Sequence, residues 1–174
     1  MKRKKTKING LLVYESKIFH DKRGSVQETF KKNSINKNLY LSIISKSKKN
    51  VVRGLHLQVK KSQDKLVSVV KGKILDVVVD LRKNSSTFGK HFKIILSENK
   101  GKYLFVPQGF AHGYLGLASE NIVLYSCSNY RNAQYERCIQ WNDKDLNIKW
   151  GVKNPILSKR DKNAQTLKKF IESK

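Results

Sequence analysis

The 174-residue chain is poor in proline, cysteine and acidic side chains. Its two prolines leave the extended segments free to pair in sheets, because proline removes a backbone donor. Its two cysteines, Cys127 and Cys138, are too few for a disulfide framework, and their spacing matches no zinc site. We therefore interpret both cysteines as small buried apolar residues.

Long apolar runs are absent as well. No stretch approaches the roughly 20 apolar residues that a membrane span needs. The basic start MKRKKTK resembles the beginning of a signal peptide, but the run LLVY behind it is too short for the apolar core of one. We therefore expect a cytoplasmic protein with no membrane partner.

The scarcity of acidic residues leaves a large positive charge. Lysine and arginine number 37 against 13 acidic residues, so the formal net charge is +24, which favours anionic partners. Only seven of the 37 are arginine, and the lysines are scattered through every segment. No recognition helix, zinc module or aromatic platform accompanies them. The pattern is typical of a compositional bias or a solvated surface, and nucleic acid is not favoured as a partner.

The remaining pattern is one of short β-rich runs separated by turn signals, which predicts an all-β chain with a sandwich or barrel fold. We expect a single domain over residues 1–174, with a basic and mobile N-terminus at 1–8. The N-terminal strands exceed what the sandwich or barrel needs and are expected to pair elsewhere. The Lys71-Gly72 pair predicts a tight hairpin between 65–70 and 73–81. Only the last segment has helical spacing, with Leu167, Phe170 and Ile171 on one side.

Alternation along the strands places polar side chains among apolar neighbours. Lys65 shares a face with Val67 and Val69, and Tyr125 shares one with Val123 and Cys127. In VVRGLHLQ, residues 51–58, strict alternation puts one set on a common face: Val52, Gly54, His56 and Gln58. Any one of these polar residues could be a satisfied core residue. Together they predict a barrel with a ligand pocket.

The segment GKYLFVPQGFAH, residues 101–112, resembles the second motif of the cupin superfamily, whose fold is a small β-barrel. The first cupin motif is altered, because His56-x-Gln58 and Lys65 stand where a metal-binding cupin has His-x-His and a glutamate. A lysine ammonium repels a cation, and two histidines are a poor ligand set. We expect no metal.

The resemblance then narrows to one family. VVRGLHLQ, KLVSVVKGKILDVVVDLRKNSSTFG, VPQGFAHGY and IQWND resemble the nucleotide-sugar 3,5-epimerases typified by dTDP-4-dehydrorhamnose 3,5-epimerase, over residues 19–161. The resemblance implies a cupin-type β-barrel (jelly roll) with extra N-terminal strands and a short C-terminal helix. It also implies an isomerase without cofactor, which epimerises C3, C5 or both in an NDP-4-keto-6-deoxy sugar through an enolate. The pathway would be the synthesis of dTDP-rhamnose and surface glycans such as lipopolysaccharide.

The resemblance also assigns roles to residues. His56 would be the base, Asp161 the carboxylate that orients it, Tyr125 the proton donor and Lys65 the cation near the keto oxygen. Asp161 has a competing interpretation as a first-turn helix residue behind a Ser158 cap. Residues predicted to contact the substrate are Arg23, Glu28, Arg53, Gln58, His112, Arg131, Glu136 and Arg160. The family exchanges N-terminal strands, so we expect a homodimer in which Arg23 and Glu28 reach the neighbour's pocket.

Three features leave alternatives open. Leu41, Ser42 and Ile43 replace a Gln-x-Asn pair of the family, and Arg131 replaces a tyrosine that stacks on thymine, so another nucleotide would be compatible. Strict alternation puts Arg53 opposite His56, which requires either a bulge at Gly54 or a side chain that reaches around an edge. The rival functions are a 3-epimerase or 3,4-ketoisomerase on the same scaffold, and a non-catalytic binder of anionic sugars or nucleic acid.

Overall fold

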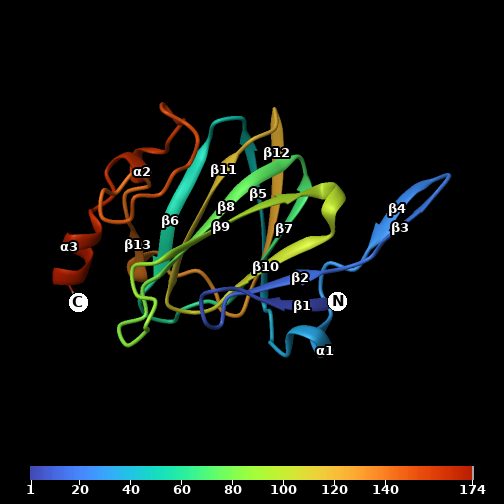
Figure 1. Cartoon of the computed structure of the whole chain (residues 1–174), viewed down its shortest axis with the longest axis horizontal. Coiled ribbons are helices and arrows are strands. Elements are labelled where there is room, and N and C mark those ends of the chain that lie inside the picture. Colours follow the sequence, from blue (N-terminus) through green and yellow to red (C-terminus); the bar gives the residue numbers. More distant parts are fainter. Residues whose placement is uncertain (174) are drawn as a thin grey trace.

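The computed structural model describes residues 1–173 and consists mostly of antiparallel strands in two facing sheets (Figure 1). One sheet has six strands in the order β1 (Lys2–Lys5), β2 (Leu12–Glu15), β10 (Lys102–Val106), β7 (Lys65–Lys71), β12 (Glu120–Cys127) and β5 (Leu41–Lys48). The other has five in the order β13 (Glu136–Cys138), β6 (Val52–Gln58), β11 (Phe110–Gly116), β8 (Lys73–Asp80) and β9 (His91–Ser97). The predicted all-β class is confirmed.

The space between the sheets holds an apolar core at one end. Val67, Val69 and Val123 point inward from the six-stranded sheet and pack with Val78 and Tyr114 of the five-stranded sheet. These strands read as mixed apolar and polar sequences because one face meets this core. The apolar packing holds the two sheets together, and it leaves the polar side chains of the same strands to line a cavity.

A second core covers the outer face of the five-stranded sheet. Leu55, Val77 and Val79 pack there against Trp150 and Phe170 of the C-terminal segment. Figure 1 shows that α2 (Lys159–Lys162) and α3 (Leu167–Glu172) lie beside β6 and β13. The C-terminal segment therefore reaches the strand that carries RGLH.

The predicted C-terminal helix is shorter than its sequence pattern indicates. Thr166 caps α3 by accepting a hydrogen bond from the Lys169 amide, so the helix begins at Leu167. Leu167 and Phe170 are buried, as expected, but Ile171 is 46% exposed. Another short helix, α1 (Lys32–Ile35), was not predicted, and the 3₁₀ turns η1 and η2 cover Glu98–Lys100 and Ala133–Tyr135. No helix in residues 1–173 is long and apolar enough to cross a membrane.

The N-terminal region differs from the expectation in one part. Residues 2–5, expected to belong to a mobile terminus, form β1 and pair in antiparallel fashion with β2. The predicted strand over 11–19 is divided into β2 and β3 (Ile18–Asp21), and β3 pairs with β4 (Gly24–Gln27). Figure 1 shows this β3–β4 hairpin projecting away from the two sheets.

The predicted hairpin at Lys71-Gly72 is wrong, because β7 and β8 belong to different sheets. Gly72 does have the expected positive φ, at +81°, but it turns the chain from one sheet to the other. A Cβ at Gly72 would lie 2.2 Å from the carbonyl oxygen of Glu120, so only glycine fits this corner. Tertiary packing across the barrel edge replaced the local pairing that the turn residues suggested.

The position of Arg53 is explained by a bulge in β6. His56 pairs with His112 and Arg53 pairs with Tyr114, so three steps along β6 match two steps along β11. Gly54 lies so close to Gly113 that a Cβ on it would be 2.5 Å from the Gly113 Cα. Arg53 and His56 consequently face the same cavity, whereas Val52 faces the outer core with Leu55. The expected face is therefore wrong for Val52, and the bulge is the correct alternative for Arg53.

Candidate active site

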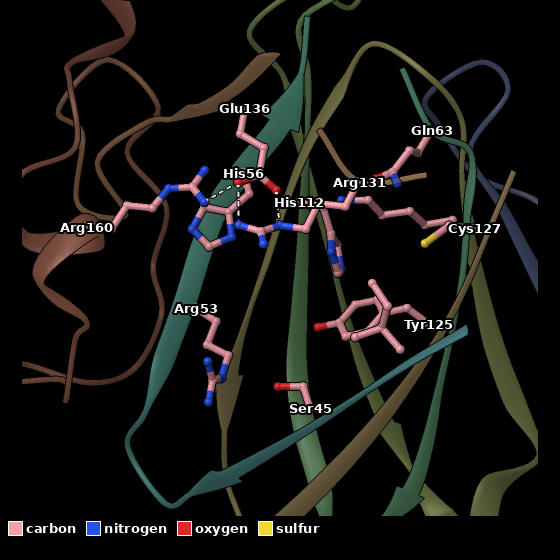
Figure 2. A pocket seen from close by; sticks show the side chains of 12 residues that line it. Ser45, Arg53, His56, Gln63, His112, Tyr125, Cys127, Arg131, Glu136 and Arg160 are labelled. Atoms are coloured by element: carbon pink, nitrogen blue, oxygen red, sulfur yellow. Dashed lines mark hydrogen bonds and ion pairs between the residues drawn. The ribbon is translucent and has the colours of Figure 1, made fainter. Parts of the chain in front are cut away.

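A cavity of about 360 Å³ opens between the two sheets at the polar end of the barrel (Figure 2). Eight of the twelve predicted site residues line it: Arg53, His56, Lys65, His112, Tyr125, Arg131, Glu136 and Arg160. Its other lining residues are Ile43, Ser45, Gln63 and Cys127. Of these, Cys127 shares the face of Tyr125 in the alternation of β12. The sequence offered no signal for Ser45 or Gln63.

His56 and Asp161 form a hydrogen-bonded pair at one wall of the cavity. His56 Nε2 lies 2.6 Å from Asp161 Oδ1, and these residues come from β6 and α2. Asp161 is also the first-turn residue of α2, where the Ser158 hydroxyl accepts a hydrogen bond from its amide. Both sequence interpretations of Asp161 are therefore compatible, because the helix cap is what holds the carboxylate behind His56.

The Asp161 carboxylate receives more donors than His56 alone. Ser158 Oγ donates to its Oδ2 at 2.7 Å, and Cys138 Sγ donates to its Oδ1 at 3.4 Å. Burial raises the pKa of Asp161, but the hydrogen bonds from His56, Ser158 and Cys138 outweigh burial and hold it below its ordinary value. Asp161 therefore stays ionised. Sequence reasoning missed Cys138 as a partner, because the contact spans two segments that are separated in the sequence.

His56, Cys138 and Asp161 present possible metal-ligand atoms within 4.8 Å of one another. Burial, followed by the neighbouring Asp161 charge, raises the pKa of Cys138 to about 12, so its thiol remains protonated. The ring nitrogen and the carboxylate oxygen already bind each other. A protonated thiol and a mutually paired histidine and aspartate are a poor ligand set.

A second histidine–aspartate pair lies deeper in the cavity. His112 Nε2 is 2.9 Å from both carboxylate oxygens of Asp76, and the two side chains are 4% and 0% exposed. Burial raises the pKa of Asp76, although the neighbouring His112 and Lys65 act in the opposite direction. Sequence reasoning missed Asp76. The available signal was a carboxylate within the apolar run KILDVVVDL.

Tyr125 and Lys65 belong to the six-stranded sheet, opposite the strand of His56. The Tyr125 ring makes an edge contact with the His112 ring, with centroids 5.8 Å apart, and Figure 2 shows its hydroxyl pointing into the cavity. Burial raises the Tyr125 pKa well above its ordinary value, so the phenol stays protonated. Burial also lowers the pKa of Lys65, an effect opposed by Cys127, Glu136 and Asp76.

Charged side chains occupy the rim of the cavity beside His56 (Figure 2). Glu136 accepts hydrogen bonds from Arg131 at 2.7 and 3.0 Å, and it also pairs with Arg160. Arg53 is held by Ser47 and by the Lys46 carbonyl, at 2.9 and 3.0 Å. Three guanidinium groups therefore surround the entrance, a chemistry that suits a diphosphate.

The other predicted contact residues lie outside the cavity of this chain. Gln58 is buried, and its amide binds the Lys61 carbonyl and the Asn132 amide at 2.8 and 2.7 Å. It fixes two loops and does not line the cavity, which differs from the expectation. Arg23 lies in the β3–β4 hairpin and pairs with Asp21, while Glu28 follows β4.

Proton transfer between the two faces of a carbon needs a base and an acid on separate sides of that carbon. His56 and Tyr125 stand on opposite sheets with a cavity between them. A base and an acid on opposite walls of one cavity, inside a small β-barrel, are the arrangement that an isomerase of the proton-transfer type needs.

Comparison with known proteins gives the family. The family model described as dTDP-4-dehydrorhamnose 3,5-epimerase matches residues 5–169. A dTDP-4-dehydrorhamnose 3,5-epimerase from Shigella flexneri is 40% identical, over 97% of this chain and 96% of that protein. The chain belongs to the dTDP-4-dehydrorhamnose 3,5-epimerase family, and it is an epimerase.

Two solved structures support the same conclusion. The dTDP-4-dehydrorhamnose 3,5-epimerase from Bacillus anthracis, with TDP and PPi bound, is 37% identical with a TM-score of 0.92, covering 95% of this chain and 99% of that one. A dTDP-6-deoxy-D-glucose-3,5-epimerase from Legionella pneumophila, in complex with dTDP-4-keto-L-rhamnose, is 34% identical with a TM-score of 0.92. It covers 96% of this chain and 93% of that one. The fold and the family predicted from the sequence are confirmed.

Proposed function

We propose that this chain inverts C3 and C5 of a dTDP-4-keto-6-deoxy sugar, with His56 and Tyr125 acting on opposite faces of the ring. The substrate class is supported by the ligands of the Bacillus anthracis and Legionella pneumophila relatives. The observation that carries the proposal is the His56–Asp161 pair, 2.6 Å apart, facing Tyr125 across one cavity. Epimerisation needs this two-sided arrangement, because the proton leaves from one face and returns to the other.

His56 is the proposed base. Its Nε2 is bonded to Asp161, and among residues 1–173 its Nδ1 has no hydrogen-bond partner, so Nδ1 is the nitrogen available to a substrate proton. Asp161 fixes the ring orientation and stabilises the imidazolium that forms when the proton is taken. Because Asp161 stays ionised, the pair gains a favourable charge interaction as the imidazolium appears.

The 4-keto group makes the protons on C3 and C5 acidic, and its oxygen becomes negative in the enolate. Lys65 and His112 line the cavity and are proposed to face that oxygen. Their donors act in a buried environment, where electrostatic stabilisation of developing charge is stronger than in water. Asp76 would hold the His112 ring in position from behind.

Tyr125 is the proposed acid. Because burial keeps its phenol protonated, it can deliver a proton to the enolate on the face away from His56. The net reaction moves only protons and changes no oxidation state, so it requires no electron carrier. The guanidinium groups of Arg53, Arg131 and Arg160 are proposed to hold the diphosphate at the rim.

The test is product analysis by NMR in deuterated water with a panel of NDP-4-keto-6-deoxy sugars. Exchange and inversion at both carbons, with the dTDP sugar turned over fastest, would support the proposal. Inversion at C3 alone would make the chain a 3-epimerase, and movement of the keto group would make it a 3,4-ketoisomerase. Salt-sensitive binding without exchange would indicate a non-catalytic binder.

The active form is proposed to be a homodimer in which Arg23 and Glu28 enter the neighbour's cavity. Support comes from the projecting β3–β4 hairpin, whose Phe19 and Val26 are 57% and 73% exposed (Figure 1). β5 forms one edge of the six-stranded sheet, where among residues 1–173 it has β12 as its neighbouring strand, and it exposes Ile44. A hairpin that exposes apolar side chains and a sheet edge that exposes Ile44 can pack against each other in a symmetric pair.

Subunit mixing tests this arrangement. Arg23→Ala and His56→Ala damage different halves of a shared site, so a mixed dimer contains one site with both native residues. After random exchange of an equimolar mixture about half of the dimers are mixed, so we expect the inactive parents to regain about a quarter of the wild-type rate. Absence of rescue, after mass spectrometry has shown mixed dimers, would overturn the shared site.

A further inference from the structure

The hydrogen bonds behind the proposed base are unevenly distributed. Asp161 Oδ1 accepts from both His56 Nε2 and Cys138 Sγ, while Oδ2 accepts from Ser158 Oγ. Each donor takes a share of the charge on the carboxylate. The attraction that Asp161 offers to a protonated His56 therefore depends on two side chains that do not reach the cavity.

Cys138 is placed for this contact by the sheet. It pairs directly with His56 in the register between β13 and β6, so its side chain lies beside the histidine on the same wall. Its thiol stays protonated under working conditions, because burial and the Asp161 charge raise its pKa to about 12. Cys138 is therefore a neutral donor that competes with His56 for Oδ1.

Ser158 is placed by the helix. Its hydroxyl oxygen accepts from the Asp161 amide at 3.1 Å and donates its proton to Asp161 Oδ2 at 2.7 Å. The same side chain therefore begins α2 and ties down the carboxylate. Thr166 caps α3 in a similar way, by accepting from the Lys169 amide, but it makes no hydrogen bond to Asp161 among the residues that the structure describes.

We propose that Cys138 and Ser158 are positioning residues of the His56–Asp161 pair, whose hydrogen bonds limit the charge offered to His56 and so set how tightly the pair holds a proton. This inference rests on the proposed function of His56. Without either donor, the carboxylate retains more negative charge and attracts a proton more strongly. The pair then remains protonated to a higher pH, and the base is available only at a higher pH.

Other charges also face the pair and are common to every variant below. Arg160 comes from α2, Glu136 from β13, Arg131 from the loop before it, Lys65 from β7 and His112 from β11. None of them is altered by a change at Cys138 or Ser158. A difference between variants in the acidic limb of the rate profile therefore reports the two hydrogen bonds.

The experiment measures kcat/KM against pH with a dTDP-4-keto-6-deoxy sugar. For Cys138→Ala we expect the midpoint of the acidic limb to rise by about half a pH unit, the scale of one weak hydrogen bond to a charged group. Ser158→Ala should raise it at least as far, since its bond is shorter. Cys138→Ser keeps a donor and should move the midpoint by less than Cys138→Ala does.

Thr166→Ala is the matched control, because it removes a helix cap without touching Asp161. It should lower the melting temperature to an extent similar to Ser158→Ala and leave the acidic limb unmoved. Acidic limbs that coincide with wild type in both alanine variants would overturn the inference. An equal movement in Thr166→Ala would also overturn it, because lost stability would then be the cause.

A second measurement needs no turnover. In protein labelled with ¹³C at aspartate carboxyl groups, the Asp161 resonance is assigned through Asp161→Asn, and its titration midpoint should be higher in Cys138→Ala. If the alanine cavity impairs folding, Cys138→Val fills similar space without a donor. An unchanged Asp161 titration contradicts the inference. A wild-type rate in His56→Asn would instead contradict the proposed base, so the two failures are distinguishable.

Discussion

The protein contains two histidine–aspartate pairs that differ in their surroundings. In the first pair the His56 side chain is 31% exposed at the cavity wall and Asp161 behind it is 3% exposed, whereas His112 and Asp76 are 4% and 0% exposed. The pKa of Asp161 is lowered because three side chains donate to it, and the pKa of Asp76 is raised because burial dominates. The pKa of the aspartate is therefore shifted in opposite directions in the two histidine–aspartate pairs.

The difference follows from the number of donors around each carboxylate. Asp161 sits in the first turn of a capped helix and receives His56, Ser158 and Cys138. Among residues 1–173, His112 is the side chain that donates a hydrogen bond to Asp76. The ionised Asp161 stabilises the imidazolium that forms when His56 takes a proton. The buried Asp76 holds His112 in one orientation, which suits a hydrogen-bond donor. We therefore expect the two histidines to do different work.

The largest effect is expected at His56. His56→Asn should reduce both deuterium exchange and inverted product by about 10³-fold or more, because the other imidazole of the cavity, His112, is proposed to donate to the keto oxygen and not to take the proton. His112→Asn should reduce the rate less and retain exchange. His91→Asn, away from the cavity, is the control and should keep the wild-type rate. Equal losses at His56 and His112 in NMR exchange assays would remove the distinction between the pairs.

Lys65 lies near the buried pair and is the residue proposed to stabilise the enolate that both steps share. Lys65→Ala should lower exchange and inversion together by roughly 10²-fold, the usual range for loss of one oxyanion donor. Because burial lowers the pKa of Lys65, its ammonium is lost as pH rises through a value below that of an ordinary lysine. The wild-type rate should therefore fall on the alkaline side. Lys65→Arg stays charged, so its rate should not fall on the alkaline side. If the Lys65→Arg rate still falls with rising pH, a group other than Lys65 causes the fall.

Tyr125 contacts the buried pair but is expected to affect only one step. Tyr125→Phe should lower inverted product by about 100-fold, while solvent deuterium still enters the starting sugar through His56. The reason is that the enolate still forms and can be reprotonated on its original face. Parallel NMR measurement of exchange and inversion checks this. An inversion rate equal to wild type would show that another group is the donor.

The two carboxylates should also differ in how stability depends on pH. A lowered folded pKa means that ionised Asp161 stabilises the fold above the ordinary carboxyl range and loses this contribution as pH falls through the lowered value. A raised folded pKa means that Asp76 stabilises the fold at low pH and loses this contribution as pH rises. Asp161→Asn should therefore lower the melting temperature by a few degrees more at neutral pH than in acid.

Asp76→Asn should show the opposite trend, with its melting temperature improving relative to wild type as pH rises. Calorimetry of both variants at acidic and neutral pH checks the signs. The same trend in both variants would contradict the contrast between the two environments.

The smallest effect is expected from chelation. Dialysis against EDTA should leave the rate unchanged, because the sequence resemblance predicts Gln58 and Lys65 at the positions of cupin metal ligands and the Cys138 thiol is held protonated. A metal ion bound by His56, Cys138 and Asp161 would replace the hydrogen bond between His56 and Asp161 and would leave the His112–Asp76 pair unchanged. A large loss of activity that a divalent ion restores would therefore contradict the hydrogen-bonded pair described above.

The sequence by itself determined the all-β class, the family and most of the cavity residues. Period-two alternation sorts side chains by face wherever a strand is regular, which is why Tyr125 and Cys127 were correctly placed on one face of their strand. The motif RGLH and the segment LSKRD identified His56 and Asp161 through resemblance, although they are 105 residues apart. Local turn chemistry also predicted the positive φ of Gly72 correctly.

The tertiary structure decided which strands pair, where a strand is irregular and which side chains from distant segments come into contact. The close approach of Gly54 to Gly113 allows the bulge that turns Arg53 into the cavity, and packing across the barrel edge sends β7 and β8 into different sheets. The pairing of β11 with β8 places Asp76 beside His112, and the packing of α2 near β13 places Asp161 within hydrogen-bond distance of Cys138. Such partners come from distant segments, and their pKa values depend on burial and donor number, which exist only once the chain is folded.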